Sequence, residues 1–205
     1  MSIKKTGTLL SATLGLLMAA LPAQATVGYA DVVLDYYNSG AYSPFSTGSF
    51  GGTVTSHPVI VSTSVALDAP DGTFLSLPTG SFVTLGFTDE TVVDGVGGDI
   101  FVKEIGSGGE SANVYVSADT VNFVFLGVAN NSSTTTFDLN DISFTGAVQA
   151  IKIVGNDAGG SSPGFDLDSV QVLPGSIGAP VPAPASIIIF ALGCGLLGFQ
   201  RKTST

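Results

Sequence analysis

Residues 113–127 read NVYVSADTVNFVFLG, two runs of β-branched and aromatic residues on either side of a short polar segment. Such runs around turn-forming residues predict two antiparallel strands joined by a tight turn. Between the two ends of the chain, no window shows an apolar stripe of helical period. Similar runs, separated by Gly-, Asn-, Asp- and Ser-rich clusters, predict further strands. With the first two included, the predicted strands are residues 32–37, 81–87, 100–105, 112–117, 122–126, 134–139, 148–154 and 165–173. We therefore expect an all-β body, an antiparallel β-sandwich or jelly roll of roughly ten strands.

The composition excludes several classes of protein. The chain has 205 residues, enough for one compact domain with a substantial core. It contains one Cys and one His, so neither a disulfide framework nor a Cys/His zinc site can be built. Its 6 Lys and Arg residues are too few for the basic patch that a nucleic-acid binder needs. Residues 26–180 hold 2 bases and 16 acids, a formal charge of 2 − 16 = −14.

The first 25 residues have the three parts of a secretory signal peptide. Lys4 and Lys5 give a positive start, residues 9–21 are apolar, and Ala23 and Ala25 form the small-x-small pattern that signal peptidase cuts after. A retained membrane anchor is the alternative, but the apolar run is shorter than the roughly 20 residues of a full span. We therefore expect cleavage after Ala25 and export of the acidic body.

The C-terminal segment has the features of a membrane tail. A linker containing Gly, Ser and Pro at residues 175–180 is followed by an apolar run at 187–199 and then by Arg201 and Lys202. This pattern predicts a transmembrane helix over about residues 185–199 with a cytoplasmic C-terminus. A buried core helix is the alternative, but a Pro-rich linker and a basic stop are unusual for one. We expect the body, residues 26–174, to be held outside the inner membrane by this tail.

The end of the chain carries a recognisable motif. Val181, Pro182, Ala183 and Pro184 precede the Gly- and Leu-rich apolar run and the short basic end. Residues 181–205 thereby resemble the PEP-CTERM sorting signal of Gram-negative bacteria, although Ala183 stands where that family usually has Glu. The resemblance implies processing by an exosortase, a membrane-embedded protease/transpeptidase. It also implies a link to extracellular polysaccharide, so that the protein would pass from the inner membrane to the cell surface or extracellular matrix.

Three segments of the body carry a second resemblance. They are the loop and strand at residues 93–104, the hairpin at 113–127 and the final strand beginning at Gly164. In this order they resemble elements of the galactose-binding-like jelly rolls of secreted bacterial proteins. Thr120 follows Asp119 where those hairpins usually have Gly. The resemblance implies a jelly-roll body over roughly residues 80–173.

Acidic residues near glycine-rich loops are candidates for a metal site. Asp99, Asp166 and Asp168 are the candidate ligands of a structural Ca²⁺, because Ca²⁺ takes carboxylate and carbonyl oxygens. Alternation along a strand places Asp166 and Asp168 on one face together with Val170 and Val172. If that face points inward, the two carboxylates need a cation or strong donors. The alternative is that these acids cap turns and solubilise the surface.

Few residues are suited to catalysis. His57 is the single candidate for the base of a Ser or Cys hydrolase, and it lies between Ser56 and Pro58 in a polar segment typical of a surface turn. A glycosidase-type pair of carboxylates stays open among the 16 acids. We therefore expect a protein that is not an enzyme, with a secreted hydrolase as the weaker alternative.

The sequence as a whole favours an exported, non-enzymatic protein of the cell surface or extracellular matrix. The alternative is a secreted carbohydrate-binding module that recognises an exopolysaccharide or a nutrient glycan. Aromatic residues that can stack on sugar rings gather between Tyr29 and Phe50. Tyr36 and Tyr37 are adjacent and so point to opposite faces, which predicts that at least half of this group packs within the protein.

Overall fold

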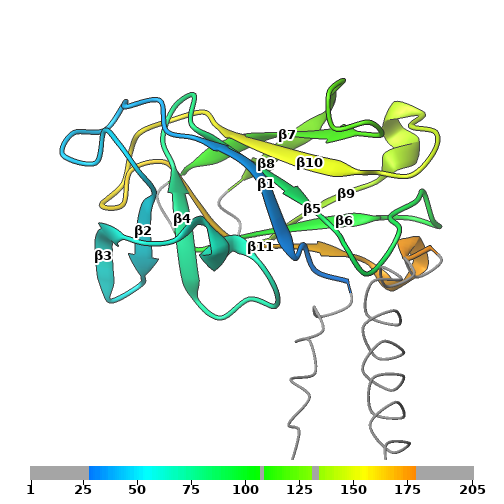
Figure 1. Ribbon diagram of the computed structural model, residues 1–205, viewed down its shortest axis with the longest axis horizontal. Helices are drawn as coiled ribbons and strands as arrows, with labels where there is room; N and C mark the ends of the chain where they lie inside the picture. The colour runs from blue at the N-terminus through cyan, green and yellow to red at the C-terminus, as the bar shows by residue number, and fades with distance from the viewer. Residues whose placement is uncertain (1–27, 107–108, 131–133, 179–205) are drawn as a thin grey trace, which may run out of the picture.

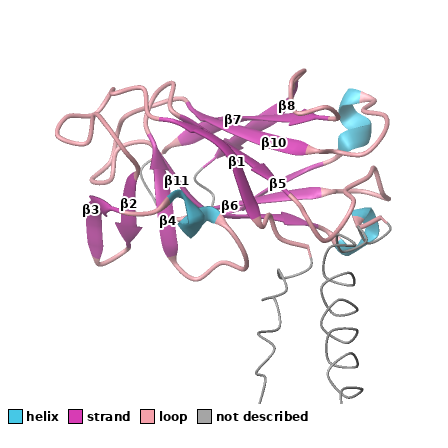
Figure 2. Ribbon diagram, viewed as in Figure 1, coloured by secondary structure: helices cyan, strands magenta, loops and turns pink. Residues whose placement is uncertain are grey.

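The chain folds into two antiparallel β-sheets packed face to face, which confirms the predicted all-β sandwich (Figures 1 and 2). The computed structural model describes residues 28–106, 109–130 and 134–178. The strands are β1 (Val32–Tyr37), β2 (Phe50–Thr53), β3 (Ser56–Ile60), β4 (Thr73–Leu77), β5 (Phe82–Gly86), β6 (Ile100–Glu104), β7 (Ser111–Ser117), β8 (Val124–Asn130), β9 (Thr134–Phe137), β10 (Ala150–Gly155) and β11 (Phe165–Val172).

The strand order explains how distant segments of the chain meet. One sheet has the order β1-β5-β10-β7-β8, and the other has the order β3-β2-β4-β11-β6-β9. Apart from the β2–β3–β4 and β7–β8 runs, each strand lies in the opposite sheet from the one before it, as in jelly-roll connections. The last strand, β11, therefore pairs with β4 and β6 from much earlier in the chain.

The core fills the space between the sheets and comes from alternate residues of their strands. Val83 and Leu85 of β5 face Ile151 and Ile153 of neighbouring β10, and all four side chains are fully buried. Leu75 and Leu77 of β4 contribute in the same way from the other sheet. Alternation with period two puts every second side chain of a strand on one face. This pattern gives one continuous apolar core.

All eight predicted strands are present, and three further ones were not predicted. The missed strands are β2, β3 and β4. Strand β2 contains Gly51 and Gly52, and β3 contains Pro58, residues that are depleted in strands. A Cβ at Gly51 would lie 2.0 Å from the carbonyl oxygen of Phe74, so β2 needs glycine in order to pair with β4.

The hairpin of β7 and β8 forms as predicted, with a strained residue at its turn. Thr120 has a φ of 64°, the left-handed conformation that glycine adopts more easily. The Asp119 carboxylate accepts hydrogen bonds from the backbone N–H groups of Val121 and Asn122 at 2.9 and 2.7 Å. These hydrogen bonds lower the pKa of Asp119 well below its usual value. The Asp119 carboxylate thus fixes the turn although Thr120 replaces glycine.

A β-bulge in β11 changes which residues face the core. The pairing with β6 shifts register between Leu167 and Ser169, so one extra residue is inserted there. Phe165 and Leu167 point into the core before the bulge, and Val170 and Val172 point into it after the bulge. The expectation that Asp166 and Asp168 share a face with Val170 and Val172 is therefore wrong. A regular period of two could not reveal the inserted residue.

The two ends of the described body lie side by side. Val172 N–H donates to the Gly28 carbonyl at 2.7 Å, and Ala30 N–H donates to the Val170 carbonyl at 3.0 Å. The body continues past residue 174, because the 3₁₀ helix η3 (Pro174–Ser176) packs on it and Gly178 N–H donates to Thr91 at 2.6 Å. Both ends thus leave the body at the same place (Figure 1).

The predicted signal peptide and sorting signal lie outside the described residues. This holds for Ala23 and Ala25, for the motif Val181–Pro184 and for the apolar run at 187–199. Among residues 28–106, 109–130 and 134–178, no helix is long and apolar enough to cross a membrane.

Candidate functional site

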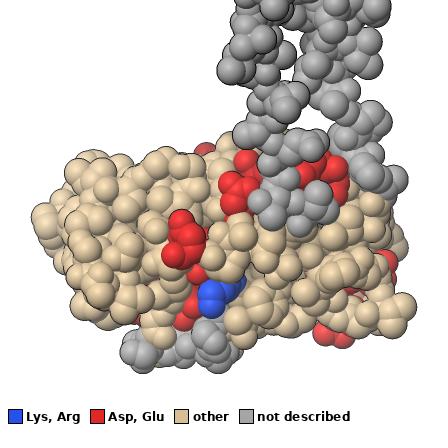
Figure 3. All heavy atoms as spheres, turned by 90° about the horizontal axis from the view of Figure 1, so that it is seen from below, with Lys and Arg blue, Asp and Glu red and all other residues tan. Residues whose placement is uncertain are grey.

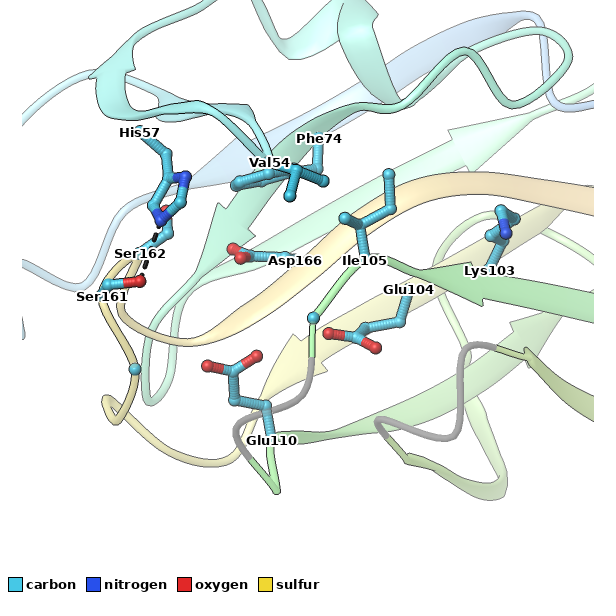
Figure 4. Close-up of a pocket in the computed structure, with 12 residues that line it drawn as sticks. Val54, His57, Phe74, Lys103, Glu104, Ile105, Glu110, Ser161, Ser162 and Asp166 are labelled. Atoms are coloured by element: carbon cyan, nitrogen blue, oxygen red, sulfur yellow. Dashed lines mark hydrogen bonds between the residues drawn. The ribbon is translucent and has the colours of Figure 1, made fainter.

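The main candidate site is a cavity of about 680 Å³ on the six-stranded sheet. His57 of β3, Glu104 of β6 and Asp166 of β11 line it, together with Glu110 just before β7 and Ser161 of the β10–β11 loop. Figure 4 shows the carboxyl groups of Glu104, Glu110 and Asp166 pointing toward one space, with His57 and Ser161 at its edge. A cavity of this size fits a small organic ligand.

The three carboxyl groups of this cavity are buried, which makes their charged forms unfavourable. Glu104 is 1% exposed, and Glu110 and Asp166 are each 5% exposed. Burial raises the pKa of Glu104 to about 7 and that of Glu110 to about 7. It raises the pKa of Asp166 to about 8, and the neighbouring charges of Glu110 and Glu104 add to this effect. Near neutral pH the cavity therefore holds a mixture of carboxylic acids and carboxylates.

Glu104 and Glu110 form a carboxyl–carboxyl pair. Each side chain influences the pKa of the other, and the charge of Glu104 raises the pKa of Glu110. Two glycines hold the pair closely. A Cβ at Gly106 would lie 2.5 Å from Glu104 Oε1, and a Cβ at Gly160 would lie 2.2 Å from Glu110 Oε1. Glycine at these positions lets the backbone come close enough to enclose both carboxyl groups.

Asp166 is held by serine hydroxyl groups. Ser76 Oγ donates to Asp166 Oδ1 at 2.5 Å and is 2.6 Å from Ser162 Oγ. These hydrogen bonds favour the carboxylate and lower the pKa of Asp166, but burial raises it by more. Ser76 and Ser162 are themselves buried, so Asp166 is fixed in one orientation.

His57 forms a contact with serine at the edge of the cavity. Its Nδ1 lies 2.8 Å from the Thr53 carbonyl oxygen, and its Nε2 lies 2.8 Å from Ser161 Oγ. The carbonyl can only accept, so Nδ1 carries the proton, and in the neutral ring Nε2 accepts from the hydroxyl group. A Ser–His contact is part of a nucleophilic triad, but here a backbone carbonyl orients the ring instead of a carboxylate. A carbonyl stabilises an imidazolium less well, so the pair is better suited to hydrogen bonding than to catalysis.

The predicted metal residues lie in three different environments. Asp166 faces the cavity. Asp168 Oδ1 accepts from Asp71 N–H at 3.3 Å, and burial raises the pKa of Asp168. Asp99 is fully buried and joins Asp94 and Asp138 in a group of carboxylate oxygens within 4.8 Å of one another. Asp99 therefore does not share a carboxylate group with Asp166 or Asp168 among the described residues. Its neighbour Asp138 was not among the predicted site residues.

Asp99 acts as a structural clip within that group. Its Oδ1 accepts from Gly95 N–H at 2.8 Å and from Ser176 Oγ at 2.5 Å, and its Oδ2 accepts from Leu139 N–H at 2.6 Å. These three bonds tie together the loop before β6, the segment after β9 and the C-terminal end of the body. The structural Ca²⁺ stays a prediction, and the Asp99 carboxylate already has partners without it.

The aromatic group of the N-terminal segment packs mainly on itself. The rings of Tyr42 and Phe45 are stacked with centroids 6.1 Å apart, and Phe45 and Phe50 are 5.1 Å apart. Phe50 is fully buried, whereas Tyr37 is 52% exposed and packs against Phe82 at 5.6 Å. Packing therefore accounts for much of this group, as expected.

Most of the charged side chains on the surface drawn in Figure 3 are acidic. Figure 3 shows acidic side chains gathered in one region of this face of the body, and basic ones are scarce on that face. Glu90 is one acid near the N-terminal end, since its Oε1 accepts from Gly28 N–H at 2.9 Å. Burial, with help from Asp89 and Asp31, raises the pKa of Glu90 to about 8. Buried acids thus occur at both ends of the body.

Comparison with solved structures gives several low-identity matches. The C-terminal domain of a chitobiase from Bacteroides fragilis matches with 10% identity and a TM-score of 0.45, over 76% of this chain and 99% of that one. A CBM32 produced by Clostridium perfringens, in complex with GlcNAc-α-1,4-galactose, matches with 12% identity and a TM-score of 0.41, over 72% and 97%. The CBM32 of AlyQ, in complex with 4,5-unsaturated mannuronic acid, matches with 13% identity and a TM-score of 0.36, over 52% and 90%. No family model and no curated protein matches the sequence.

Proposed function

We propose that this chain is an exported, non-enzymatic protein whose β-sandwich binds a carbohydrate in the cavity around Glu104, Glu110 and Asp166. The observation that carries the proposal is the convergence of buried carboxyl groups with the hydroxyl and imidazole groups of Ser161 and His57. Carboxylates accept hydrogen bonds from sugar hydroxyl groups, and serine and histidine can donate or accept. A polyhydroxylated ligand can satisfy all of these groups at once.

The position of the cavity supports a role in binding at a surface. Asp166 lies near the start of β11, and Val172, at its end, bonds to the first described residue, Gly28. Six residues of an extended strand separate the two sites by about 20 Å. The cavity therefore lies well apart from the place where both ends of the described body meet. An anchor attached through either end would leave the cavity accessible to a polysaccharide.

Binding is tested with the purified exported protein and a panel of soluble polysaccharides and their oligosaccharides. We expect one class to retard the protein in affinity electrophoresis and to titrate in calorimetry. Ser161→Ala removes a hydroxyl group at the edge of the cavity and is expected to weaken binding, whereas Asp141→Asn changes an exposed acid outside the cavity and is expected to leave it unchanged. Uniformly absent binding across the panel would refute the proposal.

Export and processing form the second part of the proposal and rest on sequence alone. Lys4 and Lys5, the apolar run and Ala25 support cleavage by signal peptidase, and Val181–Pro184 with the apolar run supports an exosortase-type sorting step. We propose anchoring in the inner membrane followed by transfer to the cell surface or matrix. Mass spectrometry of both termini of the native protein tests this. A mature chain that begins at Thr26 and ends near residues 182–186 is expected, and a chain that retains Arg201 would overturn the sorting step.

A further inference from the structure

Glu104 is a buried acid for which the described part of the chain supplies no donor. It is 1% exposed, and neither Oε1 nor Oε2 accepts a hydrogen bond from an N–H or hydroxyl group there. The carboxyl group of Glu110, another buried acid, is the neighbour that contacts it. A buried carboxylate without a donor is unfavourable. The pair therefore needs either a shared proton or a positively charged group.

The surroundings of the pair add negative charge. Asp157, which accepts from Ser111 N–H at 2.8 Å, raises the pKa values of both glutamates, and Asp166 lies across the cavity. Lys103 of β6 also lines the cavity, and its charge lowers the pKa of Glu104 by less than burial raises it. His57, whose Nδ1 lies 2.8 Å from the Thr53 carbonyl oxygen, lies on the opposite edge. A small cation is thus the group that this part of the cavity lacks.

We propose that the Glu104–Glu110 pair binds the ammonium group of an amino sugar. The inference rests on the proposed carbohydrate site and names the class of sugar that it selects. A primary ammonium group has three donors and no acceptor, which suits a pair of carboxylates. The sugar hydroxyl groups would then meet Ser161, Ser162 and His57 on the other side of the cavity. An N-acetylated or neutral sugar offers no charge to the pair.

The requirement for a compact cation follows from how closely the pair is enclosed. The backbone at Gly106 and Gly160 closes off one side of each carboxyl group, because a Cβ there would lie 2.5 and 2.2 Å from their oxygens, so a ligand must reach the pair from the cavity. A free ammonium group is small enough to reach the carboxylate oxygens, whereas an acetamido group is larger and carries an acceptor that would oppose them. Selectivity for the free amine therefore has both an electrostatic and a steric cause.

The test compares three monosaccharides that differ in a single group: glucosamine, N-acetylglucosamine and glucose. Binding is followed by amide chemical shifts of the isotope-labelled protein near neutral pH, which also report where each sugar binds. We expect glucosamine to perturb residues that line the cavity, Gly106 and Gly160 included, and to bind about tenfold or more tightly than the other two. Glu104→Gln is expected to remove this preference, and Asp141→Asn, which also replaces an acid by its amide, is expected to retain it.

Each other outcome has a defined meaning. Equal binding of the three sugars in the cavity would overturn the inference and leave the proposed carbohydrate site intact. Absence of binding by these sugars and by the polysaccharide panel would overturn both. Shifts at the same amides with CaCl₂ alone, abolished in Glu104→Gln, would assign the pair to a metal ion and overturn the amino-sugar proposal. If Glu104→Gln fails to fold, Glu110→Gln replaces it, because it removes the other member of the pair.

Discussion

The burial of Asp166 predicts an unusual dependence of stability on pH. Its pKa rises from an ordinary value of 3.8 to about 8 in the folded protein, mainly because of burial. Between these two values the unfolded chain has released the proton while the folded protein still holds it. The free energy of unfolding therefore falls as the pH rises from about 4 to 8, the reverse of the usual behaviour of carboxylates that form ion pairs.

The size of the effect follows from the shift. Each pKa unit corresponds to about 1.36 kcal/mol, so a shift of about four units sets an upper limit of about 5.5 kcal/mol. Because Asp166 lines the cavity, solvent that enters the cavity would screen the charge, and we expect about half of this limit, roughly 3 kcal/mol. For a domain of this size that difference corresponds to about 6–12 °C in Tm.

Asp166→Asn isolates this contribution. The amide has nearly the same shape, keeps an acceptor for Ser76 and does not titrate. We expect the variant and the unchanged protein to have similar free energies of unfolding near pH 4, and the variant to be more stable by roughly 3 kcal/mol above pH 8. Urea denaturation at a series of pH values measures the difference. Glu90 also has a raised pKa, but it does not interact with Asp166 and cancels in the comparison. Glu104 and Glu110 do interact with Asp166, so the measured difference includes the loss of that repulsion.

The control is Asp141→Asn, which replaces an exposed acid. We expect it to change the free energy of unfolding by the same amount at low and at high pH. Parallel curves for Asp166→Asn and the unchanged protein would refute the reasoning. They would mean that the carboxyl group of Asp166 ionises at its ordinary pH, and hence that solvent or a bound cation reaches it.

Four further predictions concern stability. Thr120→Gly should stabilise the protein by about 0.5 kcal/mol, because relief of the left-handed strain slightly exceeds the added freedom of the unfolded chain; a measured loss would show that the turn is not strained. Gly155→Ala should destabilise it by about 2 kcal/mol or more, since the new Cβ would lie 1.8 Å from the Leu77 carbonyl oxygen, and an unchanged denaturation midpoint would contradict that packing. Asp99→Ala should remove about 3 kcal/mol or more with its three hydrogen bonds, whereas an effect below about 1 kcal/mol would argue against the clip. Finally, Ca²⁺ should raise the thermal midpoint relative to a chelator if the predicted structural site exists, and identical midpoints would remove that prediction.

The strands that could be predicted are those whose own residues favour an extended chain. Strands such as β7 and β10 are rich in Val and Ile, and their boundaries lie within two residues of the prediction. Strands β2 and β3 carry Gly and Pro and form because β4 provides a partner for β2, and β2 provides one for β3. Tertiary pairing overrides local propensity in these two cases, and a single sequence contains no direct signal for it.

The candidate site was predictable only in part. Asp166 was chosen as a candidate Ca²⁺ ligand because it is one of the acids near glycine-rich loops, and it does line the cavity. Glu104 and Glu110 were not chosen, since they end one strand and precede the next, in different sheets, and their meeting depends on the turn between them. Asp138 could have been found, because pairing of β6 with β9 sets Ile100 against Phe137 and so brings the residues beside them close together. Such pairings need the register, which the β11 bulge shows to be hard to infer from alternation alone.

Two buried acids of this protein differ in a way that separates folding from function. Asp99 and Glu104 are both almost fully buried, but Asp99 accepts three hydrogen bonds that join three segments of the body. Glu104 accepts none from the donors of the described chain and contacts another acid. Asp99 thus stabilises the fold, whereas Glu104 costs stability whenever it is ionised without a partner. An apolar residue at position 104 would serve the fold better, so the carboxyl pair is best explained by a ligand that is bound at the end of the sandwich opposite the chain ends.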